Sequence, residues 1–175
     1  MLRNVNPHPF IPCDDEMTPT CEEILNIQVA GLAKRLIHTN CEHVVIGISG
    51  GLDSTLALLV AVRTFDKLGL SRKGIVGVTM PGFGTTDRTH DNATSLMQTL
   101  DISQMEISIS KAVKQHFEDI GHDINKHDTT YENSQARERT QILMDLDNKL
   151  NAMVEGTGDL SELELGGDTY NGDPM

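Results

Sequence analysis

The sequence has 175 residues, enough for one domain with a substantial buried core. Hydrophobic residues make up 38% and charged residues 23%, as in ordinary globular proteins. The 26 acidic residues exceed the 14 basic ones and give a net charge of −12, which repels nucleic acids and anionic membrane surfaces. No apolar run approaches the roughly 18 residues of a membrane helix. We therefore expect no nucleic-acid partner and no membrane partner.

The N-terminal residues predict an arm followed by a helix. Residues 1–19 hold four of the six prolines and lack the apolar core of a signal peptide, which indicates an extended arm or linker ahead of a domain at 20–175. Thr20 and Glu23 have the spacing of a capping box, so a helix is expected to begin there. The three cysteines are widely spaced and odd in number, which favours free thiols in a reducing cytoplasm.

The rest of the chain alternates between short apolar runs and helical patterns. Strands are predicted over 43–48, 74–79, 104–109 and 152–155. Helices are predicted over 54–68 and 131–150, in the segment that ends near Leu100, and from Ser110 to Gly121. Strands that alternate with helices form a parallel sheet. We therefore predict an α/β fold of three layers, Rossmann-like, with a parallel sheet flanked by helices on both faces.

A glycine-rich hexapeptide, SGGLDS at 49–54, links the first strand to the helix that follows. Its glycines allow backbone N–H groups to approach an anion, and the helix N-terminus adds its positive end. The hydroxyls of Ser49 and Ser54 can donate to phosphate oxygens. A carboxylate at Asp53 would repel phosphate unless Mg²⁺ bridged the two. The hexapeptide therefore predicts a phosphate site that uses a metal.

This loop is neither a Walker A loop nor a dinucleotide fingerprint, because it lacks their required lysine or third glycine. It resembles the pyrophosphate loop of the N-type ATP pyrophosphatases. Three later segments, 80–87, 131–137 and 156–162, followed by TYNGD at 169–173, narrow the resemblance to NAD synthetase, and in particular to its larger glutamine-dependent form. The resemblance runs from about Asn6 to the C-terminus and implies a fold like that of the adenine nucleotide alpha hydrolases.

The resemblance implies a carbon–nitrogen ligase that makes NAD from deamido-NAD in two steps. The nicotinate carboxylate attacks the α-phosphorus of ATP and forms an adenylate and pyrophosphate, and ammonia then displaces AMP. ATP and Mg²⁺ are the implied cofactors. Deamido-NAD and ammonia are the implied substrates, the ammonia being free or released from glutamine. A glutaminase domain and a homo-oligomer are expected in the parent protein, with the helix at 131–150 as a plausible interface element.

The resemblance also assigns roles to individual residues. The implied ATP-binding residues are Gly47, Ile48, Ser49, Gly50, Gly51, Leu52, Asp53, Ser54 and Thr157. The implied deamido-NAD-binding residues are Asn133, Arg137, Glu162, Gly167, Asp168, Thr169, Tyr170 and Asp173. Asp53 and Glu162 are the implied metal ligands, and with Arg137 they are the implied catalytic residues. Read alone, Arg137 also fits a surface cation, Glu162 a helix N-terminal charge and Asn133 a helix cap.

Two departures from the family pattern bear on activity. Family members continue well past the TYNGD segment, so we expect this chain to be a synthetase domain that is incomplete at its C-terminus. Several positions near the end are also unusually polar or small for the family: Asp147, Glu155, Glu164, Gly167, Asp168 and Pro174. We hypothesise that these positions contacted the missing C-terminal part or a dimer partner and were changed to suit exposure to solvent. Natural divergence is the alternative. Burial of Glu155, Glu164 and Asp168 deep inside an apolar core would contradict that hypothesis.

Three functions remain open at this point. The leading one is NAD synthetase. The second is another ATP-dependent ligase with the same pyrophosphate loop, such as a GMP synthetase or a tRNA-modifying enzyme, although the acidic charge argues against tRNA. The third is a nucleotide-binding fragment without turnover, which we favour for the isolated chain. Four histidines, His90, His116, His122 and His127, are interpreted as surface or core residues, and Met144 is interpreted as core or interface packing, rather than as site residues.

Overall fold

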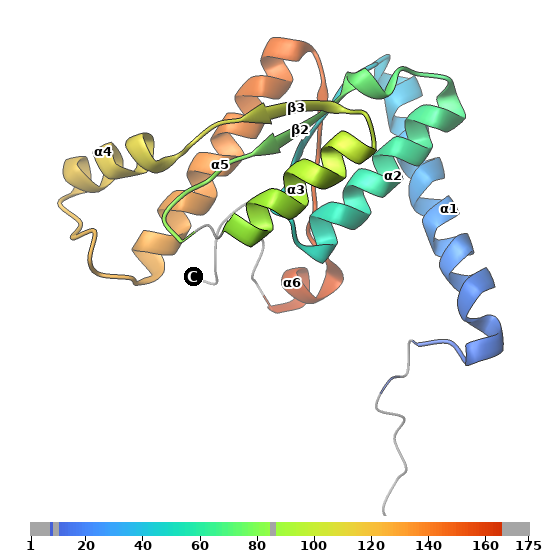
Figure 1. Cartoon of the computed structure of the whole chain (residues 1–175), viewed down its shortest axis with the longest axis horizontal. Coiled ribbons are helices and arrows are strands. Elements are labelled where there is room, and N and C mark those ends of the chain that lie inside the picture. Colours follow the sequence, from blue (N-terminus) through green and yellow to red (C-terminus); the bar gives the residue numbers. More distant parts are fainter. Residues whose placement is uncertain (1–7, 9–10, 85–86, 166–175) are drawn as a thin grey trace, which may run out of the picture.

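Four parallel strands form the centre of the computed structural model, in the order β3-β2-β1-β4 (Figure 1). The strands are β1 (Val44–Gly47), β2 (Ile75–Thr79), β3 (Ser103–Glu106) and β4 (Met153–Glu155). Val44 pairs with Ile75 of β2 on one side and with Met153 of β4 on the other. The structure describes residues 8, 11–84 and 87–165. The predicted parallel α/β sheet is confirmed.

Helices cover both faces of this sheet. They are α1 (Asp14–Thr39), α2 (Leu52–Leu68), α3 (Asp87–Thr99), α4 (Ser110–Ile120), α5 (Thr129–Leu150) and the short α6 (Leu160–Leu165), and a 3-10 turn at Arg72–Gly74 precedes β2. In Figure 1, α2 and α3 lie in front of the strands and α5 lies behind them. α4 packs against α5 at the end of the molecule far from α1.

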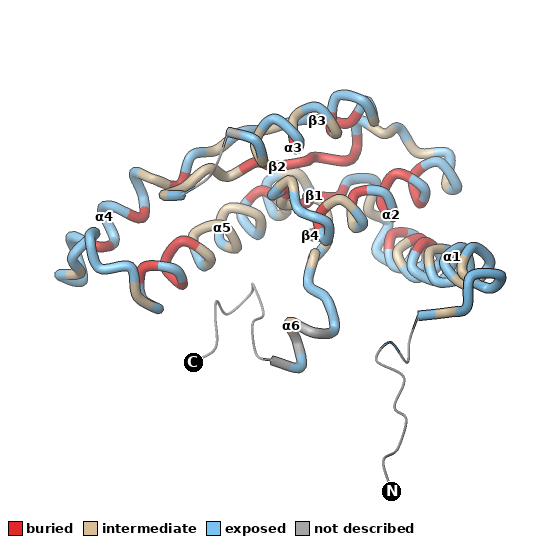
Figure 2. The backbone as a smooth tube through the Cα atoms, turned by 60° about the horizontal axis from the view of Figure 1, so that its bottom comes forward, coloured by how far each residue is buried: buried red, intermediate tan, exposed pale blue. Residues whose placement is uncertain are grey.

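The buried side chains explain why the first strand is apolar at every position. Val44 and Ile46 pack with residues of α1, α2 and α3, whereas Val45 packs with Leu146 of α5 on the opposite face. Successive strand residues point to opposite faces, so a strand covered on both sides needs a continuous apolar run. Figure 2 shows the buried residues concentrated on the central strands, on α2 and on the N-terminal part of α5.

The first helix begins earlier than predicted. α1 starts at Asp14 with Cys13 as N-cap, so Thr20 lies inside the helix and the predicted capping box is wrong. The acidic run 14–16 fills the first turn, where carboxylates are stabilised by the positive end of the helix dipole. Pro19 lies one turn further on and costs the helix one backbone hydrogen bond. The residues that α1 buries are Val29, Ala33 and Leu36, which recur at helical spacing.

Other boundaries differ by a few residues. β3 ends at Glu106 rather than at 109, although the Ile107 N–H still donates to the Thr79 carbonyl at 2.9 Å. Ser110 is the first residue of α4, and its N-cap is Ile109, so Ser110 does not cap this helix. α5 begins two residues before 131 because the Asp128 carboxylate accepts hydrogen bonds from the first-turn N–H groups of Thr130 and Tyr131.

Two further predictions concern membranes and thiols. Within 11–84 and 87–165, the helices are all too short or too polar to cross a lipid bilayer. The three cysteines are free thiols: Cys13 and Cys21 are exposed and Cys41 is partly buried.

Candidate functional site

The strand order creates a crevice between β1 and β4. From β1 the chain moves through α2, β2 and α3 to β3 on one side, and it returns through α4 and α5 to place β4 on the other side. α2 therefore leaves β1 over one face of the sheet, and α5 enters β4 over the opposite face. Ligands of open α/β sheets bind at the carboxyl ends of the strands where the order reverses. The loops 48–51 and 156–159 meet this condition.

The loop after β1 requires glycine at Gly50. This residue has φ = +83°, a left-handed conformation that side chains rarely adopt. A Cβ there would also collide with the carbonyl oxygen of Thr89 in the first turn of α3. Gly51 then caps α2, whose first turn contains Asp53. The loop is thus fixed by its own backbone conformation and by its close approach to α3.

Hydroxyl groups tie this loop to the start of α2. The Gly51 N–H donates to Ser49 Oγ at 3.2 Å, and Ser49 Oγ lies 3.1 Å from Ser54 Oγ. The Ser54 hydroxyl also donates to the Gly51 carbonyl, as does that of Thr55. Ser49 is exposed whereas Ser54 is buried. Ser49 therefore faces the crevice, whereas Ser54 forms hydrogen bonds inside the loop.

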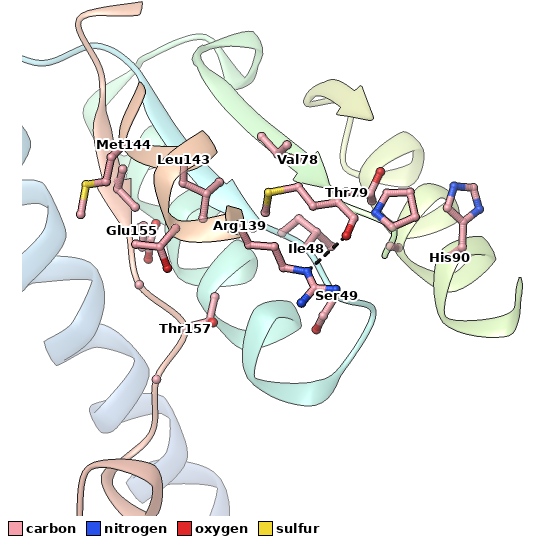
Figure 3. Close-up of a pocket in the computed structure, with 18 residues that line it drawn as sticks. Ile48, Ser49, Val78, Thr79, His90, Arg139, Leu143, Met144, Glu155 and Thr157 are labelled. Carbon is pink, nitrogen blue, oxygen red and sulfur yellow. Dashed lines mark hydrogen bonds between the residues drawn. The ribbon is translucent and has the colours of Figure 1, made fainter. Parts of the chain in front are cut away.

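A cavity of about 400 Å³ opens beside this loop, and we call it the first cavity (Figure 3). Its walls come from the ends of β1, β2 and β4, from α3 and from the middle of α5. Val78, Leu143 and Val154 make much of the wall apolar, whereas Ser49 and Thr157 add hydroxyls. A mainly apolar cavity with a few polar groups is typical of a small-molecule site.

Arg139 brings a positive charge into the first cavity. Its Nε donates to the Met80 carbonyl at the end of β2, at 3.2 Å. Burial lowers the pKa of its guanidinium, and the charge of Glu132 partly offsets that effect. No carboxylate of the described residues lies within ion-pair distance of it.

The loop after β2 is held against α5 by Gln135. The Gln135 Oε1 accepts from the Phe83 N–H at 3.0 Å, and its Nε2 donates to the Tyr131 carbonyl at 3.2 Å. A Cβ at Gly82 would lie 2.7 Å from Gln135 Oε1 and 3.0 Å from Arg139 Nη2, so a larger residue here would displace those side chains. α5 thus fixes one wall of the first cavity.

Glu155, the last residue of β4, places a carboxyl group in the wall of the first cavity. Its Oε2 is buried and makes no hydrogen bond in the described part of the chain. Burial raises the pKa of this carboxyl to about 8. The group therefore carries a proton at neutral pH.

His90 of α3 also lines the first cavity. Its Nε2 lies 2.6 Å from Glu106 Oε2 at the end of β3. Hydrogen bonding to Glu106 raises the pKa of His90, and Asp91 adds a smaller effect in the same direction. The imidazole thus joins α3 to β3 at the edge of the cavity.

A second cavity of about 460 Å³ lies between α1, α2 and the loop after β4, and we call it the second cavity. Asp53 lines it on one side, and Thr157 and Asp159 line it on the other. Asp159 and Glu162 form a reciprocal cap: Asp159 Oδ1 accepts from the Glu162 N–H at 2.7 Å, and Glu162 Oε2 accepts from the Asp159 N–H at 3.1 Å.

The structure distributes the predicted site residues unevenly. Gly47, Ile48, Ser49 and Thr157 line the first cavity, and Asp53 lines the second. Asn133 is buried within α5 and Arg137 is exposed on it, and neither lines either cavity. Gly167, Asp168, Thr169, Tyr170 and Asp173, predicted to bind deamido-NAD, lie outside the described residues.

Four residues that line the first cavity were not among the predicted site residues. His90 was interpreted as a surface or core residue and Met144 as core or interface packing, Glu155 was expected to suit solvent, and Arg139 was not singled out. A signal for Arg139 was present, because Gln135, Arg139 and Leu143 repeat every four residues on the inward face of α5. Arg137 falls off that stripe, which explains its exposure.

The hypothesis about polar departures has a mixed outcome. Glu164 is exposed and Asp147 is partly buried. Glu155 is only partly buried and so is not deep inside an apolar core, although one of its carboxyl oxygens is buried without a hydrogen-bond partner in the described part of the chain. Gly167, Asp168 and Pro174 lie outside the described residues.

Comparisons with known proteins agree on one family. A family model described as NAD synthase matches residues 24–175. The glutamine-dependent NAD(+) synthetase of Mycobacterium leprae is 46% identical over all of this chain, which covers 27% of that protein. A structure of the glutamine-dependent NAD+ synthetase of Acinetobacter baumannii in complex with ADP matches 86% of this chain and 28% of its own, with a TM-score of 0.78 and 28% identity. The NMN synthetase of Francisella tularensis matches 87% of this chain and 60% of its own, with a TM-score of 0.74 and 27% identity.

Proposed function

We propose that this chain, which belongs to the NAD synthase family, supplies the ATP-binding part of an enzyme that converts deamido-NAD to NAD. The chain spans about a quarter of the length of the M. leprae relative, so the activity of the whole protein is part of this proposal. The observation that carries it is the loop 48–51, fixed at the switch point of the sheet and ending at the N-terminus of α2.

The two cavities suggest how ATP would lie. The first cavity has apolar walls that suit a purine and a ribose, and it adjoins Ser49 of the loop. The second cavity adjoins Asp53 and the first turn of α2. Thr157 borders both cavities. We therefore propose that the nucleoside occupies the first cavity and that the β- and γ-phosphates lie over the loop, toward the second cavity.

The proposed chemistry needs positioning and charge neutralisation more than a protein nucleophile. A carboxylate oxygen of the nicotinate attacks the α-phosphorus, the bond from that phosphorus to the bridging oxygen breaks, and pyrophosphate leaves. Ammonia then attacks the acyl carbon and AMP departs with the former carboxylate oxygen. Ser49 and the N–H groups around Gly50 would hold the pyrophosphate.

Mg²⁺ is a further part of the proposal. Within the described chain, no three side chains of metal-binding type converge on one point. Mg²⁺ commonly takes one or two carboxylates and completes its shell with phosphate oxygens and water. Asp53 fits this requirement because it is exposed beside the second cavity. Glu162 fits in part, since its Oε2 already accepts the Asp159 N–H.

The second substrate and the partners rest on the family. Asn133, Arg137, Glu162 and the residues at 167–170 and 173 are proposed to contact deamido-NAD. We also propose a glutaminase domain and a homo-oligomer for the whole protein, since curated relatives that the chain matches are named glutamine-dependent. A cytoplasmic location is supported by the three free thiols, which a reducing compartment preserves.

Calorimetry tests nucleotide binding, and an assay for AMP tests turnover. The chain is titrated with ATP and Mg²⁺, then incubated with ATP, ammonia and deamido-NAD. We expect ATP to bind and AMP release to be slow or absent without the remainder of the enzyme. Failure to bind ATP would contradict the proposal.

Parallel incubations separate the other functions. AMP release with deamido-NAD would show that this chain is sufficient for catalysis. AMP release with the nicotinate mononucleotide alone would favour the activity named for the F. tularensis protein. ATP binding with no AMP from either acceptor supports a nucleotide-binding module that completes its site with other residues.

A further inference from the structure

We propose that Arg139 binds a phosphate oxygen of the nucleotide and so anchors the ligand in the first cavity. This inference rests on the proposed function for the identity of the ligand. It assigns to Arg139 a role separate from that implied for Arg137, the exposed arginine two residues earlier.

The position of Arg139 favours a ligand-binding role. Its side chain extends from α5 into the first cavity, toward the carboxyl ends of β1 and β2 (Figure 3). The hydrogen bond from Nε to the Met80 carbonyl fixes the plane of the guanidinium. Ser49, at the start of the phosphate-binding loop, lines the same cavity. A group bound between them would meet a hydroxyl and a planar cation.

The charges around Arg139 favour an anionic ligand. Arg139 is partly buried, and withdrawing a guanidinium from water is costly unless an anion or several acceptors compensate it. In a chain of net charge −12, a carboxylate partner would be easy to supply, yet none of the described carboxylates lies within 4.0 Å of it. Glu155 lines the same cavity but does not form an ion pair with it. The compensating anion is therefore expected to come with the ligand.

The chemistry of the side chain favours phosphate. A guanidinium donates two parallel hydrogen bonds to a phosphate group, and such charge-assisted bonds are stronger than neutral ones. The Met80 carbonyl accepts a hydrogen bond from Nε alone, and the Arg139 side chain lines the first cavity. An adenosine without phosphates would leave this cation unmatched.

The experiment compares two ligands across three variants. Arg139→Met removes the charge, Arg139→Lys keeps the charge but removes the planar fork, and Arg63→Met removes an exposed arginine of α2 as the matched control. Calorimetry measures Kd for ATP and for adenosine. We expect Arg139→Met to weaken ATP binding about 10- to 100-fold and to change the Kd for adenosine by less than about twofold. The loss of ATP affinity in Arg139→Lys should lie between those of Arg139→Met and the unmodified chain. The control should match the unmodified chain.

Equal losses for ATP and adenosine would overturn the proposal, because they would indicate a role in shaping the cavity. An unchanged ATP affinity would also overturn it. Where Arg139→Met gives no cooperative thermal transition, Arg139→Lys decides by the same two criteria.

A second probe separates this proposal from the proposed function. Inorganic phosphate should raise the melting temperature of the unmodified chain and of Arg63→Met, but not that of Arg139→Met. If inorganic phosphate acts in this way while ATP does not bind, Arg139 holds anions and the proposed function fails. If ATP binds and Arg139→Met has no effect on either ligand, the proposed function survives and this inference fails.

Discussion

The two sides of the crevice differ in how completely they are built. β1 lies between β2 and β4, its first three residues are fully buried, and its loop is fixed by Gly50 against α3. β4 lies at the edge of the sheet, has three residues, and buries each of them only in part. The loop after β4 is mostly exposed and leads into the six-residue α6.

The β1 side of the site is therefore preorganised, whereas the β4 side is less completely fixed by its own contacts. The conformation of the β1 loop is set by contacts that the described residues supply. Among the described residues, the β4 side carries a buried carboxyl oxygen without a hydrogen-bond partner and a strand with one unpaired edge. A free edge exposes unpaired backbone groups. We therefore expect substitutions near β1 to alter ligand binding and those near β4 to alter local stability.

The largest effect is expected from Gly50→Ala. The substituted residue would have to hold φ near +83° and avoid the Thr89 carbonyl oxygen, so the loop must move away from α3. We expect a loss of about 2–3 kcal/mol in the free energy of unfolding and a loss of ATP affinity of about 100-fold. Chemical denaturation and calorimetry measure the two quantities.

Gly156→Ala is the matched control on the β4 side. A Cβ added at Gly156 would meet no atom within 4 Å, and the φ of this residue lies outside the left-handed region. Gly156→Ala should change the free energy of unfolding and the free energy of ATP binding by less than about 0.5 kcal/mol each. Equal effects from the two alanines would refute the contrast between the two loops.

The next effect concerns Glu155 and pH. Burial raises the pKa of this carboxyl from 4.5 to about 8. Between these values the unfolded chain is ionised while the folded chain keeps the proton, so the folded state binds more protons. The free energy of unfolding therefore falls as pH rises from 4.5 to 8, by at most about 1.4 kcal/mol per unit, and levels off above that range.

Glu155→Gln should remove this contribution. We expect the variant to be more stable than the unmodified chain by about 2 kcal/mol at about pH 8.5, less than the full slope would give because the side chain is only partly buried. At about pH 4.5 the two should agree. Urea denaturation at both pH values measures the difference, with Glu164→Gln as an exposed control. A difference that does not depend on pH would contradict a protonated Glu155.

A smaller effect is expected from Asp53→Asn. Asp53 is exposed in the first turn of α2, so the substitution should leave stability nearly unchanged. If Asp53 holds Mg²⁺, the ATP affinity measured with Mg²⁺ should fall about tenfold, while the affinity measured with a chelator present should hold or rise because a repulsive charge is removed. Equal losses in both conditions would argue against a metal role.

The sequence predicted the fold well because its signals are local and strong. The apolar runs and the glycine loop follow from backbone and solvation rules that hold for any such chain. The predicted start of α1 was wrong because the prediction gave more weight to the four prolines of residues 1–19 than to the acidic run at 14–16. Acidic residues favour a helix N-terminus. The side chains of the cavity were harder to predict, since Arg139, His90 and Glu155 come together only through the order of the strands.

The smallest effect is expected from the cap of α6. Asp159 accepts from the Glu162 N–H, and Glu162 returns the bond to the Asp159 N–H. Asp159→Ala removes one of these bonds, which normally costs about 1 kcal/mol in a helix. α6 has six residues, few for a stable helix, so the loss should appear as faster amide exchange there and as almost no change in global unfolding.

The same substitution tests how closely the two sides of the crevice are coupled. The β1 loop makes its own contacts with α2 and α3, so ATP affinity without metal should stay within about twofold. With Mg²⁺ present, a fall of about threefold is expected if Glu162 is a ligand, because loss of the Asp159 cap loosens the short helix that carries Glu162. Glu164→Gln on the same short helix is the control. A large loss of affinity without metal would mean that the β4 side also shapes the β1 loop, and the two halves would then have to be treated as one unit.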